Sequence, residues 1–373
     1  MEESRTKNKS RKKILWQLAF MAVNIAVVVI IATVDFGGET ATVPFSAAAW
    51  LLKRYWYFLA AAVALTFFSI VLDTAKYAIM IRSATRRTRI FTAYTCSQLG
   101  RYYDNVTPFG SGGQPFQIHY LTTKKMDGGK AMATVITTFI LQQLAFCIAA
   151  PYFIIRYSVS SYADTLFIVL SWVGYAFFLS IPVMLVLVTI KPSIAKGIAD
   201  FFIRLLTKMK ILRHPEKLST RMHGALDRFQ QTSAYLGKNV LRVSVIFIMS
   251  LAQFAIYLAV PYFVCRALGA PAEIGMDLII RMVVVYFAVS FVPTPGNSVA
   301  VEFSFLAIFA SVLKGYVFWG ILFWRLLEFY LYLIQGLIIV ISRTIRNVKR
   351  EAAEQKRPAA LPAPQPAVSE IKT

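Results

Sequence analysis

The chain has 373 residues, of which 57% are hydrophobic and 16% are charged. A soluble protein is about half apolar and about a quarter charged, so this composition excludes an ordinary soluble enzyme and indicates a membrane protein. Forty Lys and Arg against eighteen Asp and Glu give a net charge of +22. The position of these charges along the chain decides whether they serve nucleic acid or a membrane surface.

Six apolar stretches are long enough to cross a bilayer, whose hydrocarbon core of about 30 Å is spanned by about 20 helical residues. They are Ile14–Val34, Tyr55–Ile81, Ala131–Ile155, Thr165–Ile190, Val240–Cys265 and Val317–Ile341. No cleavage site of small residues follows the first stretch. We therefore interpret it as a retained anchor and not as a signal peptide.

Two further apolar stretches, Ile90–Leu121 and Leu278–Leu313, are interrupted by Gly and Pro. Broken backbone survives at membrane depth only where protein or water surrounds it, so we predict two re-entrant hairpins. The predicted fold is an all-α polytopic membrane protein with about six full transmembrane helices plus two re-entrant helical hairpins. Both turns contain Thr-Pro with a nearby Gly, which leaves open either an inverted repeat or a chance similarity.

The basic residues predict the orientation of the chain. With the N-terminus in the cytoplasm, most Lys and Arg fall on cytoplasmic segments, as the positive-inside rule requires. These segments are 1–13, 82–90, 124–130, 191–239 and 343–373. Both termini are then cytoplasmic, and the two hairpins enter from opposite sides. Because anionic headgroups attract such residues, the net charge needs no nucleic-acid partner.

We divide the chain into a basic cytoplasmic N-terminus (1–13), a flippase-like transmembrane domain (14–343) and a tail (344–373) whose Ala/Pro-rich composition predicts disorder. The cytoplasmic loop 191–239 contains an amphipathic segment. Its apolar residues on one helical face are Ile198, Phe201, Phe202, Leu205 and Leu206. This pattern predicts a helix in the headgroup plane or, alternatively, a helix packed on the protein's own cytoplasmic loops.

The densest polar cluster lies in the first hairpin turn. Gly110, Gly112 and Gly113 permit positive φ, so their N–H groups could form a concave nest for a phosphate. Arg101 would pair with that phosphate, and Asp104 would orient Arg101 or accept a headgroup amine. The alternative is a tight turn whose glycines only let the helices pack closely. The other candidate binding residues of this cluster are Asn105, Thr107, Ser111 and Gln114.

A second polar cluster lies in the other hairpin turn. Two prolines break the incoming helix, and Asn297 or Ser298 would cap the outgoing one, leaving free N–H groups at membrane depth. Glu302 follows among apolar residues, and an intramembrane carboxylate is a functional-site hypothesis. The alternative is an ion pair with Arg281 or Arg325. Thr294 and Gly296 complete the candidate binding residues of this turn.

Two charged pairs lie inside predicted spans, Asp73 with Lys76 and Arg325 with Glu328. Each pair is three residues apart and shares a helical face, so self-neutralisation is one explanation. Arg325 and Glu328 are also kept as candidate binding residues. The cysteines and histidines do not have the spacing of metal ligands, and no catalytic triad is apparent. We therefore predict no metal, no cofactor and no catalytic residue.

The Asn105–Gly113 turn, the Pro293-Thr294-Pro295-Gly296 turn and Glu302 resemble those of the transmembrane region of lysylphosphatidylglycerol synthase, over Ile14–Arg343. This region is the flippase-like part of the multiple peptide resistance factor family. The chain departs from the family pattern at Asn297 and Val299, where glycines are often found. The resemblance implies a multi-pass protein of the bacterial cytoplasmic membrane that translocates phosphatidylglycerol, its lysyl ester or a related anionic lipid. It also implies a role in cell-envelope modification and in resistance to cationic antimicrobial peptides.

Full-length members of that family add a cytoplasmic synthase domain that uses aminoacyl-tRNA. Only a short tail follows the last predicted span, so we expect that domain to be missing here, which leaves enzymatic activity undecided. One alternative is a phosphatidylglycerol lysyltransferase, or its membrane subunit acting with a separate lipid synthase. A second is a carrier for a small solute or ion. The implied partners are an anionic phospholipid and the membrane, and homo-oligomerisation is left open.

Overall fold

In the computed structural model, residues 43–107, 112–208, 215–273, 275–292 and 300–356 are described, and every regular element in these ranges is helical. Contacts divide the chain into two compact units, Val28–Gly336 and a second unit that combines Met1–Val27 with Leu337–Thr373. Of the second unit, the described part is the C-terminal portion of helix α14 (Leu331–Lys356). The first unit contains the candidate site.

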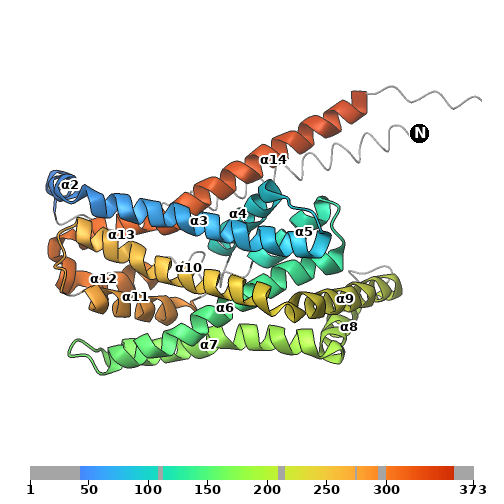
Figure 1. Cartoon of the computed structure of the whole chain (residues 1–373), viewed down its shortest axis with the longest axis horizontal. Coiled ribbons are helices and arrows are strands. Elements are labelled where there is room, and N and C mark those ends of the chain that lie inside the picture. The colour runs from blue at the N-terminus through green and yellow to red at the C-terminus, as the bar shows by residue number, and fades with distance from the viewer. Residues whose placement is uncertain (1–42, 108–111, 209–214, 274, 293–299, 357–373) are drawn as a thin grey trace, which may run out of the picture. The chain divides into compact units, whose positions relative to one another are not determined.

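Long apolar helices form the frame of the first unit (Figure 1). They are α3 (Trp56–Thr85), α6 (Gly128–Ser158), α7 (Thr165–Ile190) and α10 (Val240–Ala267). Side chains cap three of their N-termini, because Asp127, Asp164 and Asn239 each accept backbone N–H groups of the first turn. The shortest of the four has 26 residues, or ~39 Å, which exceeds the hydrocarbon core.

These helices match four predicted spans and, with the apolar stretch Phe303–Lys349, make five candidate membrane spans among the described residues. The protein is therefore a multi-pass membrane protein. The predicted span Val317–Ile341 falls inside that fifth stretch. The predicted first span, Ile14–Val34, and the predicted N-terminal segment 1–13 lie outside the described residues.

The long helices pack through small residues and aromatic rings. Helix α3 packs on α10, and α6 packs on α7 and α10. At Gly174 of α7 a Cβ would lie 1.8 Å from the carbonyl oxygen of Phe287, so only glycine allows this approach to α11 (Gly275–Val289). The rings of Phe146 and Phe254, 4.6 Å apart, join α6 to α10 in the core.

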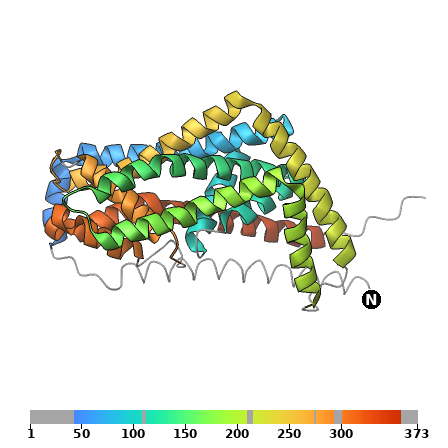
Figure 2. The same ribbon diagram turned by 90° about the horizontal axis from the view of Figure 1, so that it is seen from below.

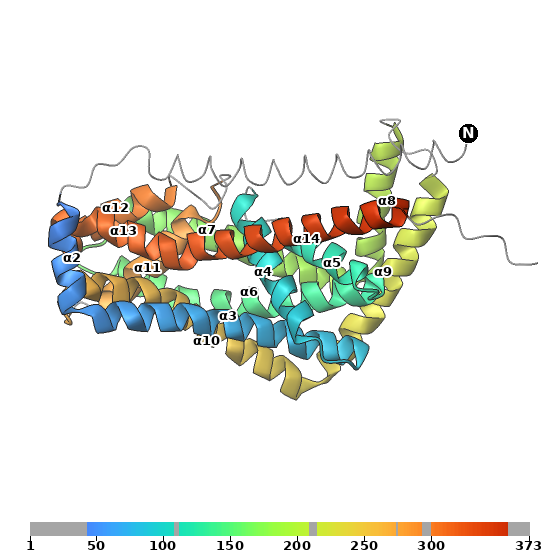
Figure 3. The ribbon, with the colours of Figure 1, turned by 90° about the horizontal axis from the view of Figure 1, so that it is seen from above.

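Two broken helical hairpins enter this frame from opposite ends. Helices α4 (Ile90–Val106) and α5 (Gly113–Thr123) follow the end of α3 and precede α6, while α11 and α12 (Ala300–Leu313) follow the end of α10. Figures 1 and 3 show the two hairpins toward opposite ends of α3. The longest of these helices has 17 residues, or ~26 Å, too short to cross the hydrocarbon core.

The helix–break–helix form predicted for both interrupted stretches is therefore confirmed for the described residues. Their re-entrant position in a membrane stays a prediction, as does the inverted repeat.

The C-terminal helical stretch contains two turns that are not α-helical. After α12 come a 3-10 turn, η3 (Lys314–Tyr316), helix α13 (Val317–Arg325), a π-helical turn, η4 (Leu326–Tyr330), and α14. The predicted span Val317–Ile341 is helical throughout, and η4 is a π-helical turn within it. A π-helical turn changes the direction of the side chains that follow it and is frequent at functional sites.

The amphipathic segment forms α8 (Pro192–Lys208) and packs on α9 (Pro215–Lys238). Helix α8 crosses the direction of α7 (Figures 2 and 3). Its Ile198, Phe201 and Leu205 are exposed, whereas Ala199 packs against Leu226 of α9. The predicted apolar face is thus present, although the side chains of Phe202 and Leu206 lie outside the described residues. Its contact with α9 supports the alternative of a helix packed on the protein's own loops, and a position in the headgroup plane stays a prediction.

Candidate functional site

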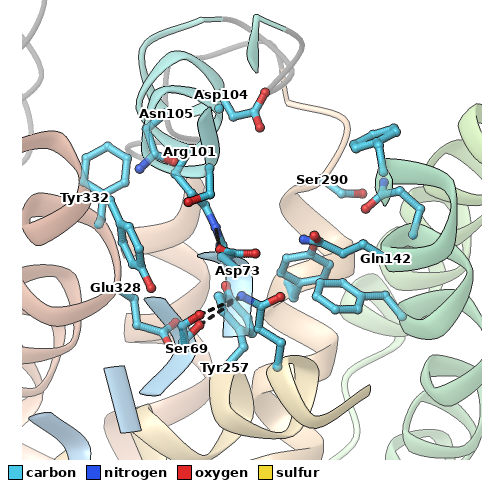
Figure 4. Close-up of a pocket in the computed structure, with 18 of the residues that line it drawn as sticks. Ser69, Asp73, Arg101, Asp104, Asn105, Gln142, Tyr257, Ser290, Glu328 and Tyr332 are labelled. Atoms are coloured by element: carbon cyan, nitrogen blue, oxygen red, sulfur yellow. Dashed lines mark hydrogen bonds and ion pairs between the residues drawn. The ribbon is translucent and has the colours of Figure 1, made fainter. Parts of the chain in front are cut away.

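A cavity of about 300 Å³ lies between the long helices and described residues of the two hairpins. Residues near both tips line it, with Arg101 and Asp104 on α4 and Ser290 just beyond the end of α11. Among the predicted binding residues that line it are Arg101, Asp104, Asn105, Gln114, Arg325 and Glu328. The cavity therefore brings together residues more than 200 positions apart in the sequence. Figure 4 shows Arg101 extending from α4 toward Asp73.

A buried charge network forms one side of the cavity. Asp73 of α3 has one carboxylate oxygen 3.1 Å from Lys76 Nζ and the other 2.9 Å from Arg101 Nε. Lys76 is fully buried and also donates hydrogen bonds to Gln142 and Gln253. Burying charges is costly unless they are paired. The network satisfies this requirement and carries one net positive charge.

Asp73 and Lys76 do pair, as the self-neutralisation interpretation expected, but Asp73 also lines the cavity and holds Arg101. Sequence reasoning did not place Asp73 in the site. The spacing of Ser69, Asp73 and Tyr77 on α3 is the signal that could have found it, because residues four apart share a helical face. All three line the cavity.

Arg101 is held from two sides. Asp73 accepts its Nε hydrogen, and its guanidinium carbon lies 5.2 Å from the ring centroid of Tyr332. The expectation that Asp104 orients Arg101 is corrected, because the carboxylate bound to Arg101 is that of Asp73. A guanidinium has further donors on its terminal nitrogens, and the Arg101 side chain is 29% exposed. It is therefore the cavity cation best placed to meet an anion.

The phosphate nest predicted at the first turn is not formed by Gly112 and Gly113. Gly112 has φ −82°, and Gly113 begins helix α5, so the expected positive φ was wrong at both. Their N–H groups donate to Thr107 Oγ1 at 2.9 Å and to Asp104 Oδ1 at 2.8 Å. The side chains of α4 thus occupy the donors that an anion would need. Gly110 and Ser111 lie outside the described residues.

Close packing explains these glycines instead. A Cβ at Gly113 would lie 2.5 Å from Asp104 Oδ1 and 2.6 Å from the carbonyl oxygen of Gly100. A Cβ at Gly112 would lie 2.5 Å from Thr107 Cγ2. The alternative interpretation of the turn, glycines that let two helices approach, is therefore supported at both positions.

Hydrogen bonds join α3, α4 and α5 at the wall of the cavity. Tyr77 OH donates to Gln117 Oε1 at 3.1 Å, and Gln117 Nε2 donates to the carbonyl oxygen of Cys96 at 3.0 Å. At Gly100 a Cβ would collide with Gln117 Nε2 at 2.1 Å. The amide of Gln117 is thus held between α3, α4 and α5.

Two more charged residues of the cavity, Arg325 and Glu328, lie at the end of α13 and in the π-helical turn. Trp324 Nε1 donates to Glu328 Oε2 at 3.2 Å, and the guanidinium of Arg325 lies 4.4 Å from the ring centroid of Phe329. All four residues line the cavity. The structure therefore brings Arg325 and Glu328 to the site, where Glu328 accepts a hydrogen bond from Trp324 and Arg325 lies against Phe329.

Of the second predicted turn, only the flanking residues are described. Thr294, Gly296, Asn297 and Ser298 lie outside the described residues, and so does the side chain of Glu302. Its neighbour Val301 lines the cavity. Arg281, one of the proposed partners of Glu302, donates to the carbonyl oxygen of Ile308 and lies 3.9 Å from the ring centroid of Tyr162.

The described residues offer the cavity no metal-binding cluster, since no group of three or more His, Cys, Asp or Glu converges in them. What the cavity does offer is paired charges, amides and phenols, including Gln142, Gln143, Tyr257 and Tyr286. Such groups recognise charge and hydrogen-bonding capacity.

Comparison with known proteins gives a consistent result. The family model described as lysylphosphatidylglycerol synthase TM region matches residues 14–336. A UPF0104 membrane protein of Archaeoglobus fulgidus is 23% identical over 273 residues, which cover 70% of this chain and 79% of the relative. No solved structure matches.

Proposed function

Because the chain belongs to the family of lysylphosphatidylglycerol synthase transmembrane regions, we propose that it is a lipid translocase that moves an anionic phospholipid between leaflets. The proposed substrate is phosphatidylglycerol, its lysyl or other aminoacyl ester, or a related anionic lipid. One observation carries the proposal. The cavity at the two hairpin tips lies part-way along the long helices and presents charges of both signs.

The charges suit a headgroup that bears both a phosphate and an amine. Ionisable residues are expensive inside a membrane and mark substrate pathways there. Arg101 would bind the phosphate, and Asp104 and Glu328 would receive the amine, since all three line the cavity. Asp73 holds Arg101 in place before substrate arrives.

The size of the cavity suits a headgroup and not a whole lipid. At about 300 Å³ it lies at the small end of ligand pockets, and two acyl chains do not fit into it. The tails would remain in the lipid, alongside the apolar side chains that α7 exposes, such as Leu166, Val169 and Val173.

The opposed hairpins supply a route to alternating access. In transporters built from inverted repeats, broken helices meet around a substrate near the midplane, and one part rocks against the other. Here α4 and α5 would close one side of the cavity, and α11 and α12 the other. We further propose the topology predicted by the basic residues, with both termini in the cytoplasm of a bacterial cell.

Two alternatives share part of this support. The cavity volume fits a carrier for a small solute equally well. The substrate of such a carrier would resemble a lipid headgroup without its acyl chains. Aminoacylation of phospholipid together with a separate synthase remains the second alternative. The paired charges and amides that line the cavity favour recognition and passage over aminoacyl transfer.

The test is transport by the purified chain in liposomes. Transbilayer movement of phosphatidylglycerol, its lysyl ester and a polyprenyl phosphate is measured side by side, with lysine uptake as the solute arm. We expect movement of phosphatidylglycerol and its lysyl ester, and loss of that movement in Arg101→Gln. Asp227→Asn is the matched control, because it breaks the exposed Lys196–Asp227 pair outside the cavity. Uptake of lysine without lipid movement would favour the carrier and reject the translocase.

A further inference from the structure

We infer that a second, basic pocket of about 400 Å³, beside the first hairpin, is a binding site for a phosphate group. The two turns that connect α3 to α4 and α5 to α6 form this pocket. Its cationic side chains are Arg87, Arg89, Lys124, Lys125 and Lys130, and its one carboxylate is Asp127.

Asp127 is already engaged by other groups. One carboxylate oxygen accepts the N–H groups of Gly129 and Lys130 as the N-cap of α6, and the other lies 3.1 Å from Arg228 Nε. The carboxylate of Asp127 therefore interacts with the N-terminus of α6 and with Arg228, which is not among the residues that line the pocket. Five cations gathered in one pocket repel each other, and a bound anion would relieve that repulsion.

The backbone of both turns is held in an uncommon conformation. Arg86 has φ 57° and Lys125 has φ 62°, in the left-handed region that side chains other than Gly rarely adopt. Such strain tends to persist at functional sites. Arg89 Nη1 donates to the carbonyl oxygen of Lys124 at 3.0 Å, which joins the two turns. The pocket is therefore built by two turns tied to each other, and not by independent surface lysines.

Buried apolar side chains also belong to the pocket lining. Ile81, Leu121 and Met126 line the pocket and are buried. The hydroxyl groups of Thr85 and Thr92 add polar groups to the lining. Cationic side chains in one lining with apolar side chains fit the phosphate of a lipid headgroup, and the same cations would also bind a soluble phosphate ester.

This pocket lies one helical turn from the central cavity along two helices. On α3, Tyr77 lines the cavity and Ile81 lines the pocket. On α5, Gln117 lines the cavity and Leu121 lines the pocket. Four residues correspond to ~6 Å along a helix. Tyr77 and Gln117, which are hydrogen-bonded to each other, both belong to the cavity lining. A headgroup bound in the pocket would thus lie close to the cavity and would enter it in the next step of transport. This role of the pocket rests on the proposed function.

The variants that test the pocket leave its backbone contacts in place. Arg87→Gln with Lys130→Gln removes two of the five cations, and neither side chain takes part in the bond that joins the turns. The matched control is Arg82→Gln with Lys238→Gln, two exposed cations outside the pocket. Arg87→Lys with Lys130→Arg keeps both charges and serves as the conservative rescue.

Binding of dioctanoylphosphatidylglycerol to the full chain is measured in neutral detergent by native mass spectrometry, with inorganic phosphate as competitor. Every variant is made in an Arg101→Gln background, which removes the phosphate ligand proposed for the central cavity, so a failure of the proposed function leaves this result readable. We expect binding to weaken about tenfold or more when two pocket cations are lost, since each is worth about 1 kcal/mol beside an anionic headgroup. The control and the rescue should bind like the Arg101→Gln parent.

Displacement of the lipid by phosphate would establish that the shared phosphate group is recognised. Lipid binding that phosphate does not displace assigns the site to a lipid. Binding of phosphate without the lipid assigns it to a soluble phosphate ester. Equal weakening by the pocket and control variants, or weakening by neither, would overturn the inference.

Discussion

Asp73 on α3 holds Arg101 on α4 across 28 positions of sequence, with Oδ2 2.9 Å from Nε. The same carboxylate neutralises Lys76, which is fully buried. One side chain therefore links the fixed frame of long helices to the hairpin that would move. This double role makes Asp73 the residue whose loss should reveal most about the site.

We predict that Asp73→Asn lowers stability and abolishes lipid transport. Removing one partner of a buried ion pair leaves an uncompensated charge, here Lys76, and typically costs about 3 kcal/mol or more. Thermal unfolding in detergent and transport in liposomes would measure the two effects. In Asp73→Asn/Lys76→Gln the stranded charge is gone, so stability should return in part while transport stays low. Wild-type transport by that double variant would contradict the role given to the Asp73–Arg101 pair.

Gly113→Ala is predicted to destabilise the first hairpin. Its Cβ would meet Asp104 Oδ1 at 2.5 Å, so the carboxylate must move and its bond to the Gly113 N–H is weakened. Overpacking of this kind costs about 1–3 kcal/mol. Gly128→Ala is the control, because a Cβ there meets nothing within 4 Å. The measurement is the unfolding midpoint of both variants, and an unchanged midpoint for Gly113→Ala would argue against the packing explanation.

Glu328→Gln should separate the two proposed substrates. The amide keeps an acceptor for Trp324 Nε1, so little stability should be lost, but the negative charge at the cavity is removed. If that charge receives the amine, transport of lysylphosphatidylglycerol should fall about tenfold more than transport of phosphatidylglycerol. Equal transport of both lipids would leave Glu328 with a structural role only.

Glu302→Gln is expected to act in the same way if Glu302 meets a headgroup. If Glu302 instead pairs with Arg281 or Arg325, its loss strands a buried cation, and both lipids and the unfolding midpoint should suffer together. Transport of the two lipids and thermal unfolding therefore distinguish the two roles. Normal transport with normal stability would exclude both.

The predicted topology can be tested with single cysteines. In a background where the buried Cys96, Cys147 and Cys265 are replaced, a cysteine at Glu273 should react with an impermeant thiol reagent from outside intact cells. A cysteine at Thr220 should react only after the cells are opened. Glu273 is preferred to Gly269, whose φ of 88° would strain a cysteine. Labelling of the Thr220 cysteine in intact cells would contradict the predicted orientation.

The sequence alone determined the features that depend on neighbouring residues. A long apolar run must satisfy its backbone by forming a helix in lipid, so α3, α6, α7 and α10 were predictable. Gly and Pro likewise predicted the break between α4 and α5. The polar character of the first turn also placed Arg101 and Asp104 among the candidates, because such residues are rare at membrane depth.

Only the tertiary structure decided which of these polar groups meet. Asp73 could have been satisfied by Lys76 three residues away, and nothing local indicates that Arg101 is its second partner. The glycines of the turn permit positive φ, yet Gly112 and Gly113 serve close packing, because the side chains of Thr107 and Asp104 take their N–H groups. Such pairings depend on how separate helices pack, and contacts between distant segments leave no periodic pattern in the sequence.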